Sequence, residues 1–291
     1  MKFEADISIM TRRFFILGCQ RSGTTLLRLI LEVHPNIFCF DETQSYSILQ
    51  NASVPELSGS PLVGFKIPRW TEQILCDELS DDGPEGSCAN FYKNEKILFM
   101  IRDVRDAVTS MFNLRLGESN WCELWVPRII AKKIKDSPAF LRTYAEELQL
   151  IEHSGNRMVG LAALYWKYKT NAFFTYREEG LPVAPISYEN LVKNPALALK
   201  HVCMHLEVAF DDNLLHHNDF SHTETYTNGL TVGGSDPKAP IKETSVGQWK
   251  KFFNNRDLDL ISRIVSDMPD RCSRIFTESP AIPPPTLPPS Q

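Results

Sequence analysis

The chain has 291 residues, of which 43% are hydrophobic and 23% charged, and its formal net charge is −5 at pH 7. This composition is ordinary for a globular protein and excludes a disordered, collagen-like or coiled-coil chain. No apolar run reaches the ~18–20 residues of a membrane span. The acidic balance disfavours nucleic acids and sulfated polysaccharides as partners, because such polyanions select basic surfaces.

The predicted elements alternate between short apolar runs and helical patterns. Strands are predicted at 14–17, 63–67, 97–101 and 182–186, and helices at 24–33, 105–116 and 195–206, with a helical, aromatic-rich segment at 121–180. This alternation predicts an α/β fold with a mainly parallel central sheet and helices on both faces. Most of the aromatic side chains of 121–180 are expected in the core, with some lining a substrate pocket.

Several segments fall outside these elements. Residues 77–90 and 221–246 are rich in turn-forming and polar residues, which is typical of surface loops. We expect residues 1–278 to form a single domain, and we expect the proline-rich residues 279–291 to form a poorly ordered tail.

The N-terminus and the cysteines indicate the compartment. Glu4 and Asp6 precede Arg12 without an apolar run between them, which is unlike a secretory signal. The seven cysteines form no Cys-x-x-Cys pair, and their odd number is typical of free thiols. We therefore expect a cytoplasmic protein without a disulfide framework or a zinc site.

A glycine-containing turn joins the first predicted strand to the first predicted helix. Gly18 and Gly23 are separated by four residues, as in phosphate-binding loops. Backbone N–H groups of such a turn, together with a helix N-terminus, bind a phosphate or a sulfate. Ser22, Thr24 and Thr25 add hydroxyl donors. The alternative is a strand-to-helix turn with a purely structural role.

This loop differs from that of a nucleotide triphosphatase. Thr24 stands where those enzymes have the lysine that acts beside magnesium. The cation here is Arg21, inside the loop. The pattern therefore favours a ligand with a diester-like phosphate anhydride over a magnesium-bound triphosphate, and we expect no metal.

The residues around the loop extend the pattern. Residues 14–43, FFILGCQRSGTTLLRLILEVHPNIFCFDET, resemble the opening of sulfotransferases that use 3′-phosphoadenosine-5′-phosphosulfate (PAPS). The resemblance is nearest to the tyrosylprotein and bacterial small-molecule branch, although Gln20 replaces the usual proline and Gln44 replaces an arginine of the tyrosylprotein enzymes. It implies a P-loop-type sulfotransferase fold with PAPS as co-substrate and its desulfated form, PAP, as product. The implied donor-binding residues of the loop are Gln20, Arg21, Ser22, Gly23, Thr24 and Thr25.

A second anion anchor is predicted at the end of the strand at 97–101. Arg102 ends this strand, and Ser110 lies eight residues later on the following helix, so that a guanidinium and a hydroxyl can converge on one phosphate. In the family that this chain resembles, this pair holds the ribose 3′-phosphate. The alternative is a surface ion pair of Arg102 with Asp103 or Asp106. Leu114 stands where the tyrosylprotein branch has a further arginine.

Two later segments also resemble the family. Residues 186–195, ISYENLVKNP, place Tyr188 near the nucleotide by that resemblance. Residues 245–252, SVGQWKKF, resemble a late GxWKxxF motif and add Ser245 and Gly247 to the implied donor site. Lys242 stands where cytosolic members have an arginine that binds the 3′-phosphate.

Sulfuryl transfer depends on positioning and on charge stabilisation, as phosphoryl transfer does. The resemblance implies that Lys66 neutralises the leaving group and that Arg21 acts with it. Glu42 lies 21 residues after Arg21 and is the implied general base. The alternatives are a surface lysine at 66 and a helix-capping or surface acid at 42.

Histidines are not expected to act as the base. Cytosolic aryl sulfotransferases use a histidine, but this chain has none between His34 and His153. His216, His217 and His222 follow the nucleotide motifs, and we expect them at the surface.

The acceptor is predicted to be a small molecule with a hydroxyl or an amine, as in natural-product tailoring. A tyrosylprotein enzyme is the first alternative; those proteins are membrane-anchored and act on acidic peptides, whereas this chain is itself acidic. A nucleotide kinase and a P-loop-like nucleotide-binding protein without transfer activity are the others.

Overall fold

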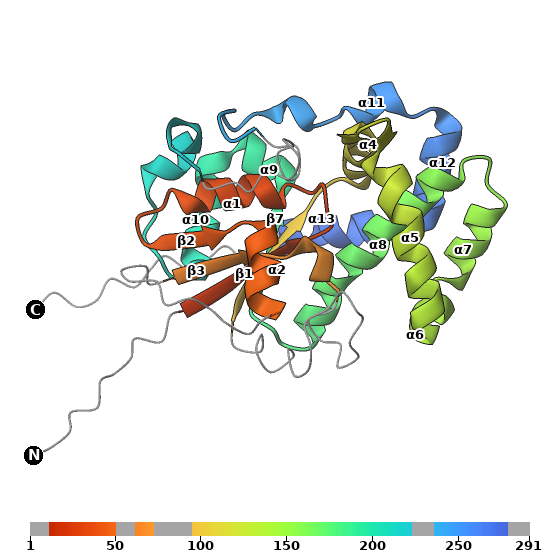
Figure 1. Ribbon diagram of the computed structural model, residues 1–291, viewed down its shortest axis with the longest axis horizontal. Helices are drawn as coiled ribbons and strands as arrows, with labels where there is room; N and C mark the ends of the chain where they lie inside the picture. Colours follow the sequence, from red (N-terminus) through yellow and green to blue (C-terminus); the bar gives the residue numbers. More distant parts are fainter. Residues whose placement is uncertain (1–11, 51–61, 73–94, 223–235, 279–291) are drawn as a thin grey trace, which may run out of the picture.

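The computed structural model describes residues 12–50, 62–72, 95–222 and 236–278. At its centre lies a parallel five-stranded sheet in the order β2-β3-β1-β4-β7 (Figure 1). The strands are β1 (Arg12–Gly18), β2 (Ile37–Phe40), β3 (Leu62–Lys66), β4 (Lys96–Ile101) and β7 (Val183–Ser187). The predicted α/β class is confirmed, and so are the four predicted strands.

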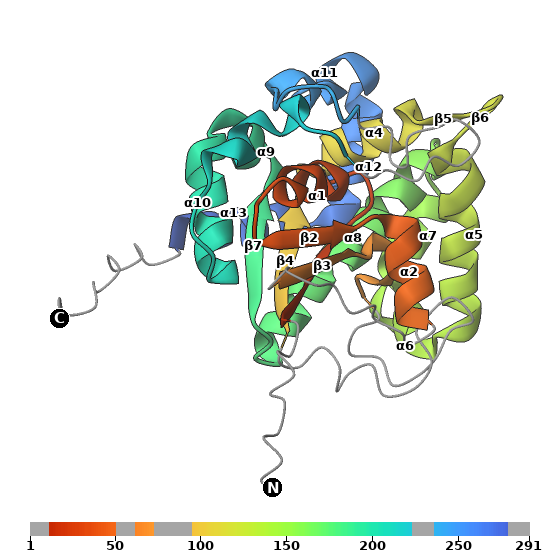
Figure 2. The same ribbon diagram turned by 60° about the vertical axis from the view of Figure 1, so that its left-hand side comes forward.

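Helices cover both faces of the sheet (Figures 1 and 2). One face carries α1 (Thr24–Glu32), α9 (Tyr188–Lys193), α10 (Pro195–Leu206) and the 3₁₀ segment η2 (Asp212–Asp219). The other carries α4 (Val104–Asn113), α5 (Trp121–Asp136), α8 (Arg157–Glu178), α12 (Asn255–Val265) and α13 (Met268–Glu278). The remaining elements are α2 (Glu42–Gln50), η1 (Pro68–Trp70), β5 (Arg115–Leu116), β6 (Ser119–Asn120), α6 (Pro138–Thr143), α7 (Ala145–Glu152), η3 (Glu243–Ser245) and α11 (Trp249–Phe252).

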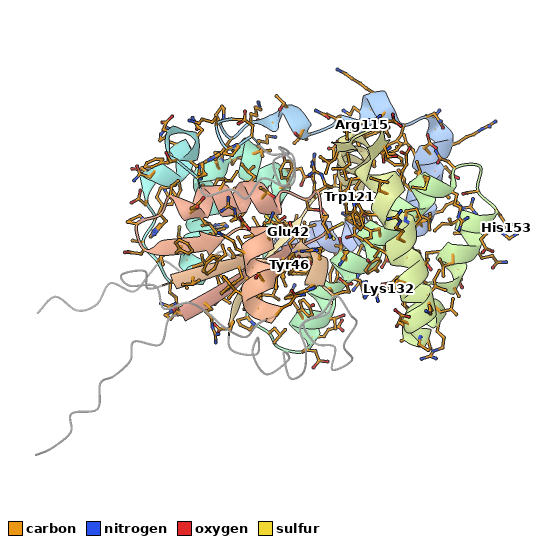
Figure 3. The ribbon with its side chains drawn as sticks, viewed as in Figure 1. Glu42, Tyr46, Arg115, Trp121, Lys132 and His153 are labelled. Carbon is orange, nitrogen blue, oxygen red and sulfur yellow. The ribbon has the colours of Figure 1, made fainter. Side chains whose placement is uncertain are left out.

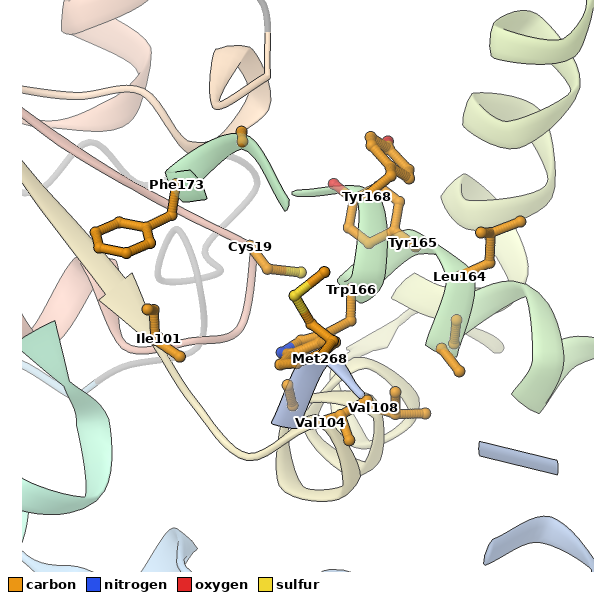
Figure 4. Packing of buried hydrophobic residues seen from close by; sticks show 14 of the residues in the cluster. Cys19, Ile101, Val104, Val108, Leu164, Tyr165, Trp166, Tyr168, Phe173 and Met268 are labelled. Carbon is orange, nitrogen blue, oxygen red and sulfur yellow. The ribbon is translucent and has the colours of Figure 1, made fainter. Parts of the chain in front are cut away.

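Two hydrophobic clusters hold these layers together. Phe14 and Ile16 of β1 face the α1, α9 and α10 layer, whereas Phe15 and Leu17 face α4, α5 and α8. All four side chains are fully buried, because successive residues of a strand point to opposite faces and this sheet is covered on both. Figure 4 shows Tyr165, Trp166, Tyr168 and Phe173 of α8 in the same buried cluster as Cys19, which follows β1. The expected aromatic core is therefore present, although Trp125 is exposed.

The predicted helix at 105–116 is three residues too long. It begins as expected, because the side chain of Asp103 accepts a hydrogen bond from the backbone N–H of Arg105. It ends at Asn113, because Leu114 is extended and β5 pairs with β6 around Gly117, whose φ is +68°. By contrast, α10 has the predicted bounds, with Pro195 in its first turn.

The predictions for the cysteines, the loops and the tail concern residues that the structure describes only in part. The five described cysteines are free and buried: Cys19, Cys39, Cys122, Cys203 and Cys272. Cys76 and Cys88, the predicted loop at 77–90 and the proline-rich tail lie outside the described residues, and the single-domain division stays a prediction. Among the described helices, none combines the length and apolar character needed to cross a membrane.

Candidate functional site

The candidate residues gather at the carboxyl edge of the parallel sheet. β1 leads into the loop at 18–23, β3 ends at Lys66, and Arg102 directly follows β4. β1 lies between β3 and β4, so these three segments come from neighbouring strands. Loops at the carboxyl ends of parallel strands form the usual ligand site of open α/β sheets.

The two loop glycines allow close packing that a side chain would prevent. A Cβ on Gly18, at φ +131°, would lie 2.4 Å from the carbonyl oxygen of Met100 on β4. A Cβ on Gly23, at φ +96°, would lie 2.4 Å from the ring of Tyr188. The loop is thereby held against β4 and against the first residue of α9.

The N-terminus of α1 has features of an anion site. Gly23 caps it without a side-chain hydrogen bond, and the first turn contains no acidic residue. The hydroxyl of Ser22 is buried and has no hydrogen-bond partner among the described residues. N–H groups at a helix start lack partners within the helix, so they can bind a phosphate or sulfate oxygen.

Arg21 and Arg102 bring the loop and the second anchor together. The Nε of Arg21 donates to the hydroxyl of Ser110 at 3.1 Å. The Nη1 of Arg102 donates to the carbonyl oxygen of Arg21 at 2.8 Å, and its guanidinium carbon lies 4.3 Å from the ring centre of Tyr188. Burial and the nearby positive charge of Arg102 lower the pKa of Arg21 to about 10. A bound anion beside the buried guanidinium of Arg21 would favour its charged form.

The alternative ion pairs of Arg102 are absent from the described residues. Asp103 pairs with Arg105 instead, at 2.5 Å. The carboxylate of Asp106 accepts the backbone N–H groups of Gly247 at 2.7 Å and Trp249 at 3.2 Å. Arg102 instead donates to the carbonyl oxygen of Ser245 at 2.6 Å.

The segment around η3 is therefore held by α4 and by Arg102. Lys242, which directly precedes η3, is exposed and has no hydrogen bond or ion pair with another described residue. The structure thus brings Ser245 and Gly247 to the second anchor but does not connect Lys242 to it. Arg115 donates to the carbonyl oxygen of Glu118 at 2.7 Å, within the β5–β6 hairpin.

Glu42 and Lys66 form a second group beside the loop. The Nζ of Lys66 donates to the hydroxyl of Thr25 at 2.8 Å and lies 3.0 Å from a carboxylate oxygen of Glu42. The side chain of Lys66 is only 2% exposed, so it is not the surface lysine of the alternative interpretation. Arg69 contacts the other oxygen of Glu42, at 3.5 Å from its Nε.

Glu42 does not cap α2. Asp41 accepts the backbone N–H of Gln44 at 2.8 Å, and the Gln44 side chain accepts the backbone N–H of Asp41 at 3.2 Å, as in a capping box. Glu42 follows as the first residue of α2, on the same helix as Tyr46 (Figure 3). Its side chain is thus free of a capping role and available beside Lys66.

Sequence reasoning missed Arg69 and Tyr46. The backbone N–H of Arg69 donates to the Tyr46 hydroxyl at 2.7 Å, and its guanidinium carbon lies 3.7 Å from the Tyr46 ring centre. The capping box at 41–44 was the signal for α2, since it predicts a helix that carries Glu42 and Tyr46 one turn apart.

Gln20 connects the loop to α8. The hydroxyl of Tyr165 donates to its side-chain oxygen, and the Tyr165 ring packs edge-on against Trp121 at 5.7 Å between centres. Burial raises the pKa of Tyr165 well above its usual value, so this hydroxyl remains a donor. The carboxamide of Gln20 therefore keeps its NH₂ group for other partners.

The prediction of surface histidines is right for His216 and wrong for His217 and His222. His217 is fully buried in η2. His222 is 2% exposed in its side chain and lies 3.0 Å from Glu32. The cause is that η2 packs against α1, which brings Glu32 to this histidine pair. Neither histidine is bonded to the loop or to Glu42.

Comparison with known proteins places the chain beside sulfotransferases. Residues 13–73 match the profile of the sulfotransferase family. The chain is 21% identical over 285 residues to a putative protein-tyrosine sulfotransferase of Caenorhabditis briggsae, with 89% of each chain covered. It is 25% identical over 236 residues to the protein-tyrosine sulfotransferase of Drosophila melanogaster, covering 71% of this chain and 40% of that protein.

Two solved structures share the fold. The sulfotransferase domain from the curacin biosynthetic pathway superposes with a TM-score of 0.54 at 16% identity, covering 88% of this chain and 98% of that one. Mouse sulfotransferase SULT7A1, solved with PAP, gives a TM-score of 0.51 at 14% identity, with 91% and 89% covered. The resemblance seen in the sequence is thereby confirmed: the chain has the sulfotransferase fold and carries the sequence pattern of the sulfotransferase family at residues 13–73.

Proposed function

We propose that this protein transfers a sulfuryl group from PAPS to a hydroxyl or an amine of a small-molecule acceptor. The observation that carries the proposal is the contact between the two anion anchors. Arg21 reaches Ser110 at 3.1 Å, and Arg102 reaches the loop backbone at 2.8 Å. A nucleotide with a 5′-phosphosulfate and a 3′-phosphate matches two adjoining anchors, whereas ATP lacks the second group.

In this proposal the donor is held by the loop and by the second anchor. The backbone of 19–25 binds the 5′-phosphosulfate, while Arg102 and Ser110 hold the 3′-phosphate. Tyr188 packs between these segments, against Gly23 and Arg102. Ser245 and Gly247 support the second anchor through their backbone contacts.

The chemistry takes place at Lys66 and Glu42. Glu42 accepts the proton of the acceptor hydroxyl or amine while the oxygen or nitrogen of that group forms a bond to sulfur. The bond between sulfur and the bridging oxygen breaks, and Lys66 stabilises the charge that remains on the PAP phosphate. The 3.0 Å distance between Lys66 and Glu42 supports placing both at one reacting centre.

A peptide tyrosine is the second candidate acceptor. The relatives named protein-tyrosine sulfotransferases favour it. Against it, Gln44 is engaged in capping α2, where those enzymes have an arginine. The test is transfer of labelled sulfate to simple phenols and to a tyrosine peptide with flanking aspartates. Transfer to the peptide alone would replace the small-molecule proposal.

The donor is tested by thermal shift with PAP, PAPS and ATP with magnesium. We expect the melting temperature to rise with PAP and PAPS and to remain unchanged with ATP. A shift with PAP but no transfer to any acceptor would favour a nucleotide-binding protein without activity. A shift with ATP and magnesium alone would favour a kinase. The cytoplasmic location and a role in natural-product tailoring stay predictions.

A further inference from the structure

Arg69 presents a guanidinium beside the proposed base. It lies in η1, three residues after Lys66, and its side chain is 58% exposed. Lys66 at 2% exposure already provides the buried countercharge of Glu42. Arg69 therefore adds a second positive charge to a carboxylate that is already paired.

Tyr46 fixes the orientation of Arg69. The guanidinium carbon lies 3.7 Å from the centre of the Tyr46 ring, and the Tyr46 hydroxyl accepts the backbone N–H of the same arginine at 2.7 Å. Tyr46 is itself 4% exposed and packs edge-on against Trp70 at 4.6 Å between ring centres. A long side chain stacked on a buried ring loses less entropy on binding a ligand than a free one.

Within the described residues, this guanidinium has one carboxylate partner. Its Nε lies 3.5 Å from Glu42, and its face contacts the Tyr46 side chain. No other carboxylate of those residues pairs with it. Two N–H groups in one plane match the two oxygens of a carboxylate.

We propose that Arg69 is an acceptor-binding residue that takes a carboxylate of the acceptor while the acceptor hydroxyl meets Glu42. The inference rests on the proposed function and names its substrate class: small hydroxy acids. Repulsion between the ligand carboxylate and Glu42 is limited, because the positively charged guanidinium of Arg69 contacts Glu42 through Nε at 3.5 Å and would contact the ligand carboxylate as well. Selection of an acid by a single exposed arginine gives specificity through charge and planar geometry.

The experiment compares 4-hydroxyphenylacetate with its uncharged analogue, 4-hydroxyphenylacetamide. Binding of each to the PAP-loaded protein is measured by calorimetry. We expect the acid to bind at least about tenfold more tightly, as for a hydrogen bond to a charged group. Arg69→Gln should remove this preference, while the affinity for PAP stays within about twofold of the wild type.

Arg263→Gln is the matched control. Arg263 of α12 is 56% exposed and lies 3.8 Å from Asp259, so its exposure and pairing resemble those of Arg69. This variant should keep the preference for the acid. The proposal is overturned if the wild type binds both compounds equally or binds neither, or if Arg69→Gln weakens both to the same extent. Failure to bind PAP at all would instead overturn the proposed function.

Discussion

The proposed function divides the site into a donor half and an acceptor half, and the arginines of the two halves differ in burial and bonding. Arg102, in the donor half, is 6% exposed and is fixed by two carbonyl oxygens and the Tyr188 ring. Arg69, in the proposed acceptor half, is 58% exposed, and Glu42 is its one ion-pair partner among the described residues. A buried arginine with several fixed contacts suits a donor that is the same in every reaction. Acceptors vary, and an exposed group can select them without disturbing the donor half.

The largest expected effect is on the acceptor half. Glu42→Gln should lower turnover at least about 100-fold, the scale for loss of a general base. PAP affinity should be retained, because Arg102 and Ser110 are unchanged. Steady-state kinetics and calorimetry with PAP measure the two effects separately.

Glu95→Gln is the control for Glu42→Gln. Glu95 has the same 17% side-chain exposure and pairs with Arg13 at 2.9 Å, outside the carboxyl-edge site. It should leave turnover unchanged. Near-normal turnover of Glu42→Gln would remove Glu42 from the mechanism and with it the division into halves.

The donor half should respond in affinity. Arg102→Ala should weaken PAP binding about 10- to 100-fold, as expected for charged hydrogen bonds in a buried place. Arg102→Lys keeps the charge but lacks the planar fork, so it should recover only part of the affinity. If the wild type binds PAPS and adenosine-5′-phosphosulfate, which differs from PAPS only in lacking the 3′-phosphate, equally well, the assignment of Arg102 is wrong.

A smaller loss is expected at Ser110. Ser110→Ala removes one hydroxyl that holds Arg21, and PAP affinity should fall by about threefold to tenfold. Ser154→Ala removes a hydroxyl that donates to the carbonyl oxygen of Ile151 at 2.8 Å, outside the carboxyl-edge site, and should leave PAP affinity unchanged. If Ser110→Ala leaves PAP affinity unaltered, Ser110 does not contribute to nucleotide binding and the arginines of the donor half account for it.

The smallest effect lies outside both halves. Burial and the neighbouring His222 lower the pKa of His217 to about 4. The unfolded chain then binds more protons than the folded protein between about pH 6.5 and 4, so stability should fall as the pH drops through this range. We expect the wild type to lose on the order of 1 kcal/mol more than His217→Gln between pH 7 and pH 5. Urea unfolding measures this, and equal losses in both proteins would contradict it.

The sequence predicted the donor half better than the acceptor half. Gly18, Gly23 and the apolar runs have local patterns, and parallel strands must bring their carboxyl ends to one edge. Arg102 ends a strand and Ser110 lies eight residues later on the following helix, so their shared place at this edge was also predictable, although Ser110 bonds to Arg21. Lys242 matched a motif only in part, and the structure leaves its side chain exposed.

The remainder depends on contacts that have no local signature. Arg69 meets Tyr46 across 23 positions, and Tyr165 meets Gln20 across 145. His217 appeared polar and exposed, but packing of η2 on α1 buried it. Tertiary packing decides such positions, and a pattern within one segment does not reveal it.

Lys66 has a consequence for the order of events. One ammonium group serves both Thr25 of the phosphate loop and Glu42. A phosphate that arrives in the loop competes with the carboxylate for this ammonium. We expect Glu42 to accept a proton efficiently only after the nucleotide has bound and has drawn Lys66 away from it. Without the sulfate donor, the pairing with Lys66 would keep Glu42 a weak base.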